Sequence, residues 1–152
     1  MHRMIKRTHL AIGLVVALYF LSHVENKFIF IPVVLFSSLL PDIDSVYSTI
    51  GKHKIFRPLQ LIFKHRGVFH SYTFCIFVTV LFAFFYPILA LPFFLGYSFH
   101  LFADSFTHEG IKPFWPLKLE SSGNIRVNGT IEHAIFWVFV LLSILLVSFS
   151  FL

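Results

Sequence analysis

Apolar side chains follow one another along most of this chain and are interrupted by short polar segments. A helix that crosses the hydrocarbon of a bilayer needs about 20 predominantly apolar residues. The pattern predicts five helices, over residues 8–24, 28–40, 70–85, 92–107 and 131–152, of which the first two are short for a complete span. Pro87 and Pro92 separate the third helix from the fourth, because proline lacks a backbone donor and helices end near it.

The composition favours a membrane protein. Hydrophobic residues make up 57% and charged residues 12% of the chain, against about 45–50% and about 25% in soluble domains. The single cysteine, Cys75, lies in an apolar run, so neither a disulfide framework nor a thiolate zinc site is expected. The expected fold is one all-α domain over residues 1–152, an integral membrane helical bundle with about five membrane helices.

The basic residues predict the orientation, because cytoplasmic loops of membrane proteins are enriched in lysine and arginine. With five helices, the segment before the first, the loop between the second and third, and the loop before the fifth share one side. That side holds eleven of the twelve basic residues, and Lys27 lies opposite. The chain is therefore expected to be a multi-pass protein of the cytoplasmic (inner) membrane with a cytoplasmic N-terminus. A removed signal peptide is the poorer interpretation.

Histidine and aspartate side chains gather at the cytoplasmic ends of the predicted helices. Residues far apart in the sequence are therefore expected to converge into one cluster, although each short motif alone also fits a turn or an interhelical hydrogen bond. Ionisable groups at membrane depth are costly and usually functional, so their number favours a metal site. They are His9 at the first helix, Asp42 and Asp44 after the second, His65 and His70 around the start of the third, and His100 and Asp104 on one face of the fourth. Glu132 and His133 open the fifth helix at the same side.

Imidazole nitrogens with carboxylate oxygens are typical ligands of zinc, manganese or iron rather than of calcium alone. An ion with an open coordination position lowers the pKa of a bound water towards about 7 and so supplies a nucleophile for hydrolysis. Asp44 is the candidate base or orienting carboxylate. Arg66 suits a phosphate oxygen, because its planar guanidinium donates hydrogen bonds in pairs. His2, His23, His53 and His108 are not expected to bind metal.

Several short motifs occur in a distinctive order over most of the chain. They are Thr8-His9, Leu40-Pro41-Asp42-Ile43-Asp44, His65-Arg66-Gly67-x-x-His70-Ser71, Gly96-Tyr97-x-x-His100-x-x-x-Asp104, Gly110-Ile111 and Trp115-Pro116. In this order the chain resembles the YdjM-like family of small inner-membrane-associated proteins, which are described as metal-dependent hydrolases. The resemblance implies a membrane protein with a hydrolytic metal site.

The order His, Asp, His and His-x-x-x-Asp is also similar to the first part of the ligand pattern in the zinc-dependent phospholipase C and single-strand nuclease superfamily of helical phosphodiesterases. That superfamily also has a further His-x-x-x-Glu pair and an N-terminal tryptophan ligand, which this chain lacks. One or two ions are therefore expected rather than three, with Asp104 able to bridge two. The ligands that the similarity implies are His9, Asp42, one of His65 and His70, His100 and Asp104.

The expected function is that of a membrane-bound hydrolase with one or two zinc ions, or manganese or iron. A site at headgroup depth beside a basic loop meets phospholipid directly, so a phosphoester in a lipid or lipid-linked substrate at the cytoplasmic face is the expected substrate. The expected partner is membrane lipid, and no nucleic-acid partner is expected. The main alternative is a non-enzymatic membrane protein whose metal or polar cluster is structural and binds a cytoplasmic regulatory protein.

Two further alternatives are weaker. A transporter or proton relay using His100, Asp104 and Glu132 needs polar groups at mid-membrane depth, and the middles of the first, third and fifth predicted helices have none. A metal-free lipid phosphatase with a histidine nucleophile would carry a Pro-Ser-Gly-His element, which is absent from the sequence.

The predicted topology can be tested with a reporter fused after Leu152. Five spans that start from a cytoplasmic N-terminus place this position on the extracytoplasmic side, so a periplasmically active reporter should be active there. A cytoplasmic reading would contradict both the number of spans and the convergence of the polar residues at one membrane face.

Overall fold

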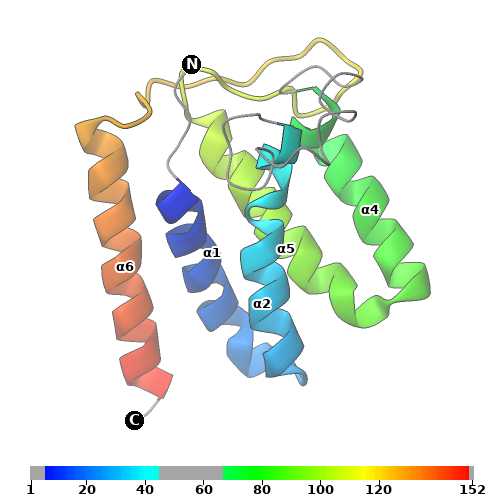
Figure 1. Ribbon diagram of the computed structural model, residues 1–152, viewed down its shortest axis with the longest axis vertical. Coiled ribbons are helices and arrows are strands. Elements are labelled where there is room, and N and C mark those ends of the chain that lie inside the picture. Colours follow the sequence, from blue (N-terminus) through cyan, green and yellow to red (C-terminus); the bar gives the residue numbers. More distant parts are fainter. Residues whose placement is uncertain (1–5, 45–66, 151–152) are drawn as a thin grey trace.

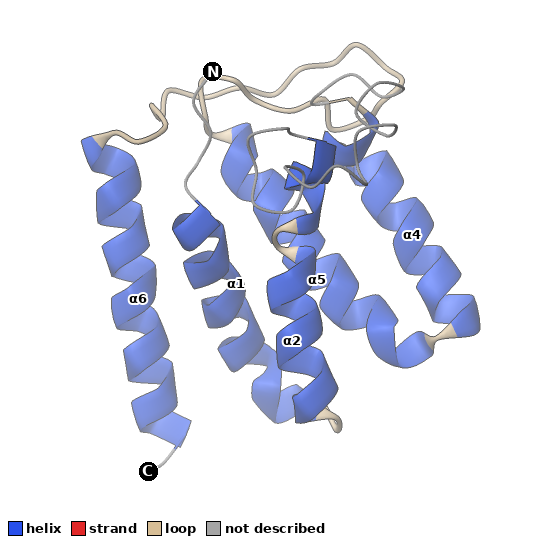
Figure 2. Ribbon diagram, viewed as in Figure 1, coloured by secondary structure: helices blue, strands red, loops and turns tan. Residues whose placement is uncertain are grey.

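The computed structural model describes residues 6–44 and 67–150, and within them the chain is helical (Figure 2). No strand occurs in these residues beyond two isolated β-bridges, so the all-α class is confirmed for the described part of the chain. The α-helices are α1 (Lys6–Phe20), α2 (Lys27–Ser37), α4 (Tyr72–Phe85), α5 (Pro87–Ser105) and α6 (Thr130–Ser150). The short 3-10 helices are η1 (Leu21–His23), η2 (Leu40–Asp44) and η4 (Val68–His70).

The helices run in alternating directions through one bundle (Figure 1). α1, α4 and α6 begin at the same end of the bundle, and α2 and α5 end there. We call this the polar end; it also contains η2, η4 and the loop over residues 106–129. α5 packs against α1, α2 and α4, and α6 packs against α1. The alternation brings to one end the segments in which the histidines and aspartates were found.

Proline separates α4 from α5 but does not interrupt α5. α4 ends at Phe85 and α5 begins at Pro87, where the missing N–H costs nothing because the first donors of a helix have no intrahelical partner. Pro92 lies inside α5, so the prediction that the fourth helix begins at Pro92 is wrong. Pro92 is fully buried, and burial of α5 against its neighbours outweighs the loss of one backbone bond.

The other predicted helices are present with shifted ends. The predicted helix over 8–24 ends at Phe20 and continues as η1, and that over 28–40 ends at Ser37. The third begins two residues later than predicted, at Tyr72, because Ser71 caps it by accepting a hydrogen bond from the Phe74 N–H. The fifth, predicted over 131–152, is α6 at Thr130–Ser150.

Four buried residues spaced by four along α5 lie on one side of the helix and lead towards the polar end: Pro92, Gly96, His100 and Asp104. Gly96 lies where α5 crosses α2. A Cβ atom at Gly96 would overlap the carbonyl oxygen of Val34 and the hydroxyl of Ser37. The Ser37 hydroxyl in turn donates to the Pro92 carbonyl at 3.3 Å. Glycine is therefore required for α2 and α5 to approach this closely.

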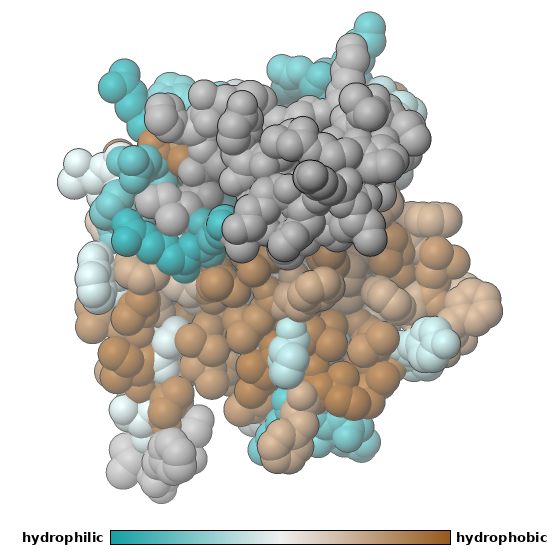
Figure 3. All heavy atoms as spheres, viewed as in Figure 1, coloured by the Kyte–Doolittle hydropathy of each residue, from teal (hydrophilic) through white to brown (hydrophobic). Residues whose placement is uncertain are grey.

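The outer surface of the bundle is apolar. Large hydrophobic side chains on α4 and α6 point outward, among them Phe84 at 80% exposure and Phe149 at 73%. Figure 3 shows hydrophobic residues across the middle of the face in view, with hydrophilic residues towards the two ends. An apolar surface of this extent is stable in lipid and not in water.

By length and composition, α5 and residues Thr130–Phe149 of α6 could cross a membrane, whereas α2 and α4 are shorter apolar helices. The five-span arrangement therefore stays a prediction.

The close crossing of α2 and α5 predicts opposite outcomes for two glycine substitutions. Both Gly96 and Gly13 lie inside helices, so alanine at either gains helix propensity of up to about 1 kcal/mol. Gly96→Ala must separate α2 from α5 and should lose a net of about 1–3 kcal/mol. A Cβ at Gly13 would meet the Ser38 hydroxyl at 3.1 Å, a contact that a small shift relieves.

Thermal unfolding in detergent micelles measures the difference. Gly96→Ala should lower Tm clearly, and Gly13→Ala should change it little. A Gly96→Ala variant as stable as Gly13→Ala would contradict the close helix crossing.

Candidate metal centre

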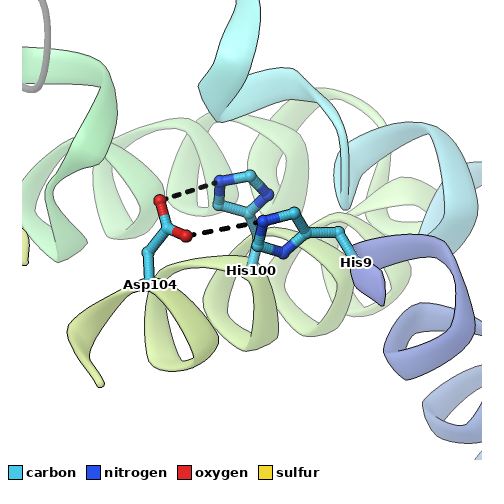
Figure 4. Close-up of side chains that lie close together, drawn as sticks. All are labelled: His9, His100 and Asp104. Atoms are coloured by element: carbon cyan, nitrogen blue, oxygen red, sulfur yellow. Dashed lines mark ion pairs between the residues drawn. The ribbon is translucent and has the colours of Figure 1, made fainter. Parts of the chain in front are cut away.

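His100 and Asp104 form the base of a buried polar cluster at the polar end of the bundle (Figure 4). Both lie on α5, where His100 Nε2 is 3.7 Å from Asp104 Oδ2. His100 Nδ1 lies 2.7 Å from the backbone carbonyl oxygen of Ser38. Because a carbonyl can only accept, Nδ1 carries the proton, and Nε2 keeps its lone pair. This nitrogen makes no hydrogen bond to any described residue and is held facing the Asp104 carboxylate.

His9 enters the cluster from the first turns of α1. Its Nε2 lies 3.4 Å from Asp104 Oδ1, the oxygen that does not face His100. The imidazole ring stacks on that of His100, with ring centroids 3.9 Å apart and an interplanar angle of 17°. His9 is 2% exposed and Asp104 is also 2% exposed. Two ring nitrogens from different helices thus face the two oxygens of one carboxylate.

His70 and Asp42 complete the cluster from the two 3-10 helices. His70 Nε2 lies 3.8 Å from Asp42 Oδ1 and 3.7 Å from Asp104 Oδ2. η4 is held in place by the Tyr97 hydroxyl, which donates to the Phe69 carbonyl at 2.5 Å. The cluster therefore draws on α1, η2, η4 and α5.

The separations between these donor atoms suit a metal ion. Two nitrogen or oxygen ligands of one tetrahedral zinc, each about 2.1 Å from the ion, lie about 3.4 Å apart. Two sets of side chains place one ligand atom each within 4.8 Å of the others: His9 with His100 and Asp104, and Asp42 with His70 and His100. All five are buried. Buried carboxylates are stable when paired with positive charge, which a cation supplies.

Five of the six predicted metal ligands are therefore brought together: His9, Asp42, His70, His100 and Asp104. The predicted ligand His65 and the predicted phosphate-binding Arg66 lie outside the described residues. The backbone of Asp44 belongs to η2, but its side chain is also outside the description. The predicted roles of His65, Arg66 and Asp44 stay predictions.

The comparisons with known proteins agree with the membrane character of this surface. The family described as YdjM inner membrane protein matches residues 4–151. The chain belongs to the YdjM family.

Two curated relatives carry the name "Inner membrane protein YdjM", one from Escherichia coli (strain K12) and one from Shigella flexneri. Each is 35% identical over 100 residues, which cover 58% of this chain and 50% of the relative. The chain thus spans about half the length of the curated relatives it matches. No solved structure matches it.

Membership of the YdjM family confirms the predicted membrane character and the inner membrane as its place. The names of the relatives state a location and no activity. The similarity to the phospholipase C superfamily stays a prediction.

Glu132 was predicted to lie at the polar end but was not among the predicted metal ligands. It is fully buried in the first turn of α6, where Oε1 accepts a hydrogen bond from the Thr8 hydroxyl at 3.1 Å. Oε2 accepts the Asn128 N–H. Because Thr8 precedes His9, this carboxylate fastens α6 beside the cluster. The available signal was a single acidic residue in the first turn of an otherwise apolar helix.

The contacts of Glu132 predict a loss of stability on truncation. Glu132→Ala removes the acceptor of two donors, which should cost about 1–3 kcal/mol and lower Tm in detergent. Glu132→Gln keeps an acceptor and should lose less.

The neighbouring His133 is the matched control. It is half-buried and bonds to the exposed Arg7 and to the Gly129 carbonyl, so His133→Ala should lose less stability than Glu132→Ala, which leaves two donors without their acceptor. An equal loss for His133→Ala and Glu132→Ala would contradict the anchoring role of Glu132.

Proposed function

We propose that this YdjM-family protein is a membrane-bound, metal-dependent hydrolase that cleaves a phosphoester in a lipid or lipid-linked substrate at the cytoplasmic membrane face. The observation that carries the proposal is the buried cluster of three imidazoles and two carboxylates. In it, His100 Nε2 is directed at Asp104 by the hydrogen bond between Nδ1 and the Ser38 carbonyl. Metal-ligating histidines typically donate their second nitrogen in this way, which fixes the tautomer that binds the ion.

The donor set favours zinc, with manganese or iron as the related choices. His9, His100 and Asp104 would hold one ion. A second ion would take Asp42 and His70. Asp104 is suited to bridge the two, because Oδ1 faces His9 while Oδ2 faces His70 and His100.

Such an ion would supply an activated water and polarise a phosphoryl oxygen. The chain's own residues exclude bulk water and orient the donor atoms, since the five side chains are buried and come from four separate elements. Asp44 as base and Arg66 as the phosphate-binding residue complete the proposal from the sequence.

Location at the membrane favours a lipid substrate for the proposed hydrolase. The cluster lies at one end of a bundle that exposes large apolar side chains on α4 and α6 and is hydrophobic over the middle of the face in Figure 3. At the end of such an apolar surface, phospholipid headgroups would be the nearest phosphoesters. A soluble phosphoester would have to reach the membrane surface, whereas a lipid is already there. The competing function uses the same cluster as a structural metal site that binds a regulatory protein. It differs from the hydrolase because a structural site has no open coordination position and turns over no substrate.

Metal content of the detergent-purified protein tests the site. Elemental mass spectrometry of the wild type should find one or two zinc, manganese or iron ions per chain. His100→Ala and Asp104→Ala should lose the metal. His23→Ala is the matched control, because His23 follows α1 in η1 and has no contact with the cluster in the described residues. It should keep the wild-type metal content.

Each variant is first checked for a single folded species by gel filtration and circular dichroism. No stoichiometric metal in the folded wild type, even after reconstitution, would overturn the proposal. Conservative variants, His100→Gln and Asp104→Asn, replace the alanines if the latter fail to fold.

Turnover separates the two functions that share the site. The metal-loaded wild type, mixed with phospholipid vesicles, should release a phosphorylated headgroup or phosphate, and a chelator should abolish the release. Bound metal without turnover on any phospholipid would favour the structural site and the regulatory partner instead.

A further inference from the structure

The loop after α5 contains a folded excursion over residues 111–121. Ile111 and Ser121 close its base through two backbone hydrogen bonds, of 2.8 and 2.9 Å. Gly110 precedes it with φ +59°, and a Cβ there would overlap the Ser121 carbonyl oxygen. This left-handed conformation and close approach both require glycine. The excursion is therefore built by specific local contacts.

The side chains of the excursion divide into a polar base and an apolar tip. At the base, Lys112 pairs with Glu120 at 3.1 Å beside a small polar hollow of about 130 Å³. The apolar tip consists of Phe114, Trp115, Leu117 and Leu119. All four point outward, with exposures between 39% and 60%. Four neighbouring apolar side chains on an ordered segment are energetically unfavourable if they face water.

The apolar tip is fastened to the rim of the bundle. The Pro113 carbonyl accepts a hydrogen bond from the Tyr72 N–H at 2.8 Å, at the first residue of α4. Figure 1 shows the loop crossing the polar end of the bundle to the start of α4 and returning to α6. The outer face of α4 is itself apolar and exposed, with Ile76 and Phe77 one turn below. The tip therefore lies next to an exposed apolar surface on α4.

We propose that the apolar tip inserts into the headgroup layer of the membrane and there contacts phospholipid. Aromatic residues with one apolar and one polar side are enriched at this level. The occupant is lipid rather than a second copy of the chain, because the tip is continuous with the apolar rim of α4 and its base carries charges of both signs, as a zwitterionic or mixed headgroup layer does.

This contact sets the depth of the candidate metal centre. Tyr72 lies two residues after His70, so the hydrogen bond to Pro113 ties the tip directly to the segment that carries a proposed ligand. With the tip in the headgroup layer, the cluster lies at or just below that layer. The contact depends on the surface alone and stands whether or not the cluster binds metal.

Tryptophan fluorescence tests the proposal, because the chain contains two tryptophans. Trp137→Phe leaves Trp115 as the single emitter in the full chain, reconstituted in vesicles of phosphatidylcholine and phosphatidylglycerol. Lipids brominated near the top of the acyl chain should cause a larger loss of Trp115 emission than lipids brominated near the chain end. Iodide in the aqueous phase should cause less loss than it does for free tryptophan.

Trp115→Phe supplies the matched control. It leaves Trp137, which is 60% exposed on α6 and lies seven residues inside that helix; this is about 10 Å along its axis. Bromines near the chain end should therefore quench Trp137 relatively more than Trp115. A double variant that keeps Trp115, Leu117→Asp with Leu119→Asp, should shift Trp115 towards quenching by iodide.

Three outcomes would overturn the proposal. Strong quenching of Trp115 by iodide with none by brominated lipid would place the tip in water. Protection from both quenchers would place it in a protein contact, such as a second copy. An identical depth profile for Trp115 and Trp137 would exclude a position in the headgroup layer.

Discussion

The hydrogen bond between His100 Nδ1 and the Ser38 carbonyl joins the end of α2 to the polar half of α5, and the candidate site is arranged around it. A carbonyl at a helix end has no partner within its own helix, and here the partner is a buried imidazole. The bond uses one ring nitrogen and leaves the other directed at Asp104. His9 stacks on His100, and His70 faces the same carboxylate oxygen as His100, so both histidines are positioned against this pair.

That hydrogen bond depends on how closely two helices approach. Gly96 lies one turn before His100 on the same side of α5, and it packs against the segment of α2 that precedes Ser38. A side chain at Gly96 would push α2 outward and carry the Ser38 carbonyl away from the imidazole. The absence of a Cβ at Gly96 thus keeps the His100 hydrogen bond in place one turn further along α5, since backbone contact between helices requires small residues.

Two opposite demands are met by one bundle. Lipid requires apolar side chains on the outside, which leaves few places for ionisable groups. The five candidate ligands and Glu132 lie buried at one end, where Glu132 fastens α6 to α1 by accepting the Thr8 hydroxyl. α6 otherwise exposes an almost entirely apolar surface, so this polar contact and the apolar seam with α1 hold it beside the rest.

The sequence by itself determined the helical class, the apolar exterior and the family, because the length and polarity of each segment decide whether it is stable in lipid. Because successive helices run in opposite directions, every second helix end lies on the same side of the bundle. The sequence therefore also indicated that histidines and aspartates gather at one end of the bundle. It misplaced the start of α5, because the local effect of Pro92 is weaker than the packing that surrounds it. Only the tertiary structure decided which ring nitrogen of His100 keeps its lone pair facing Asp104, that both oxygens of Asp104 face histidines, and that Glu132 anchors α6. Those facts depend on distances of a few ångströms between residues far apart in the chain, and no local pattern encodes such distances.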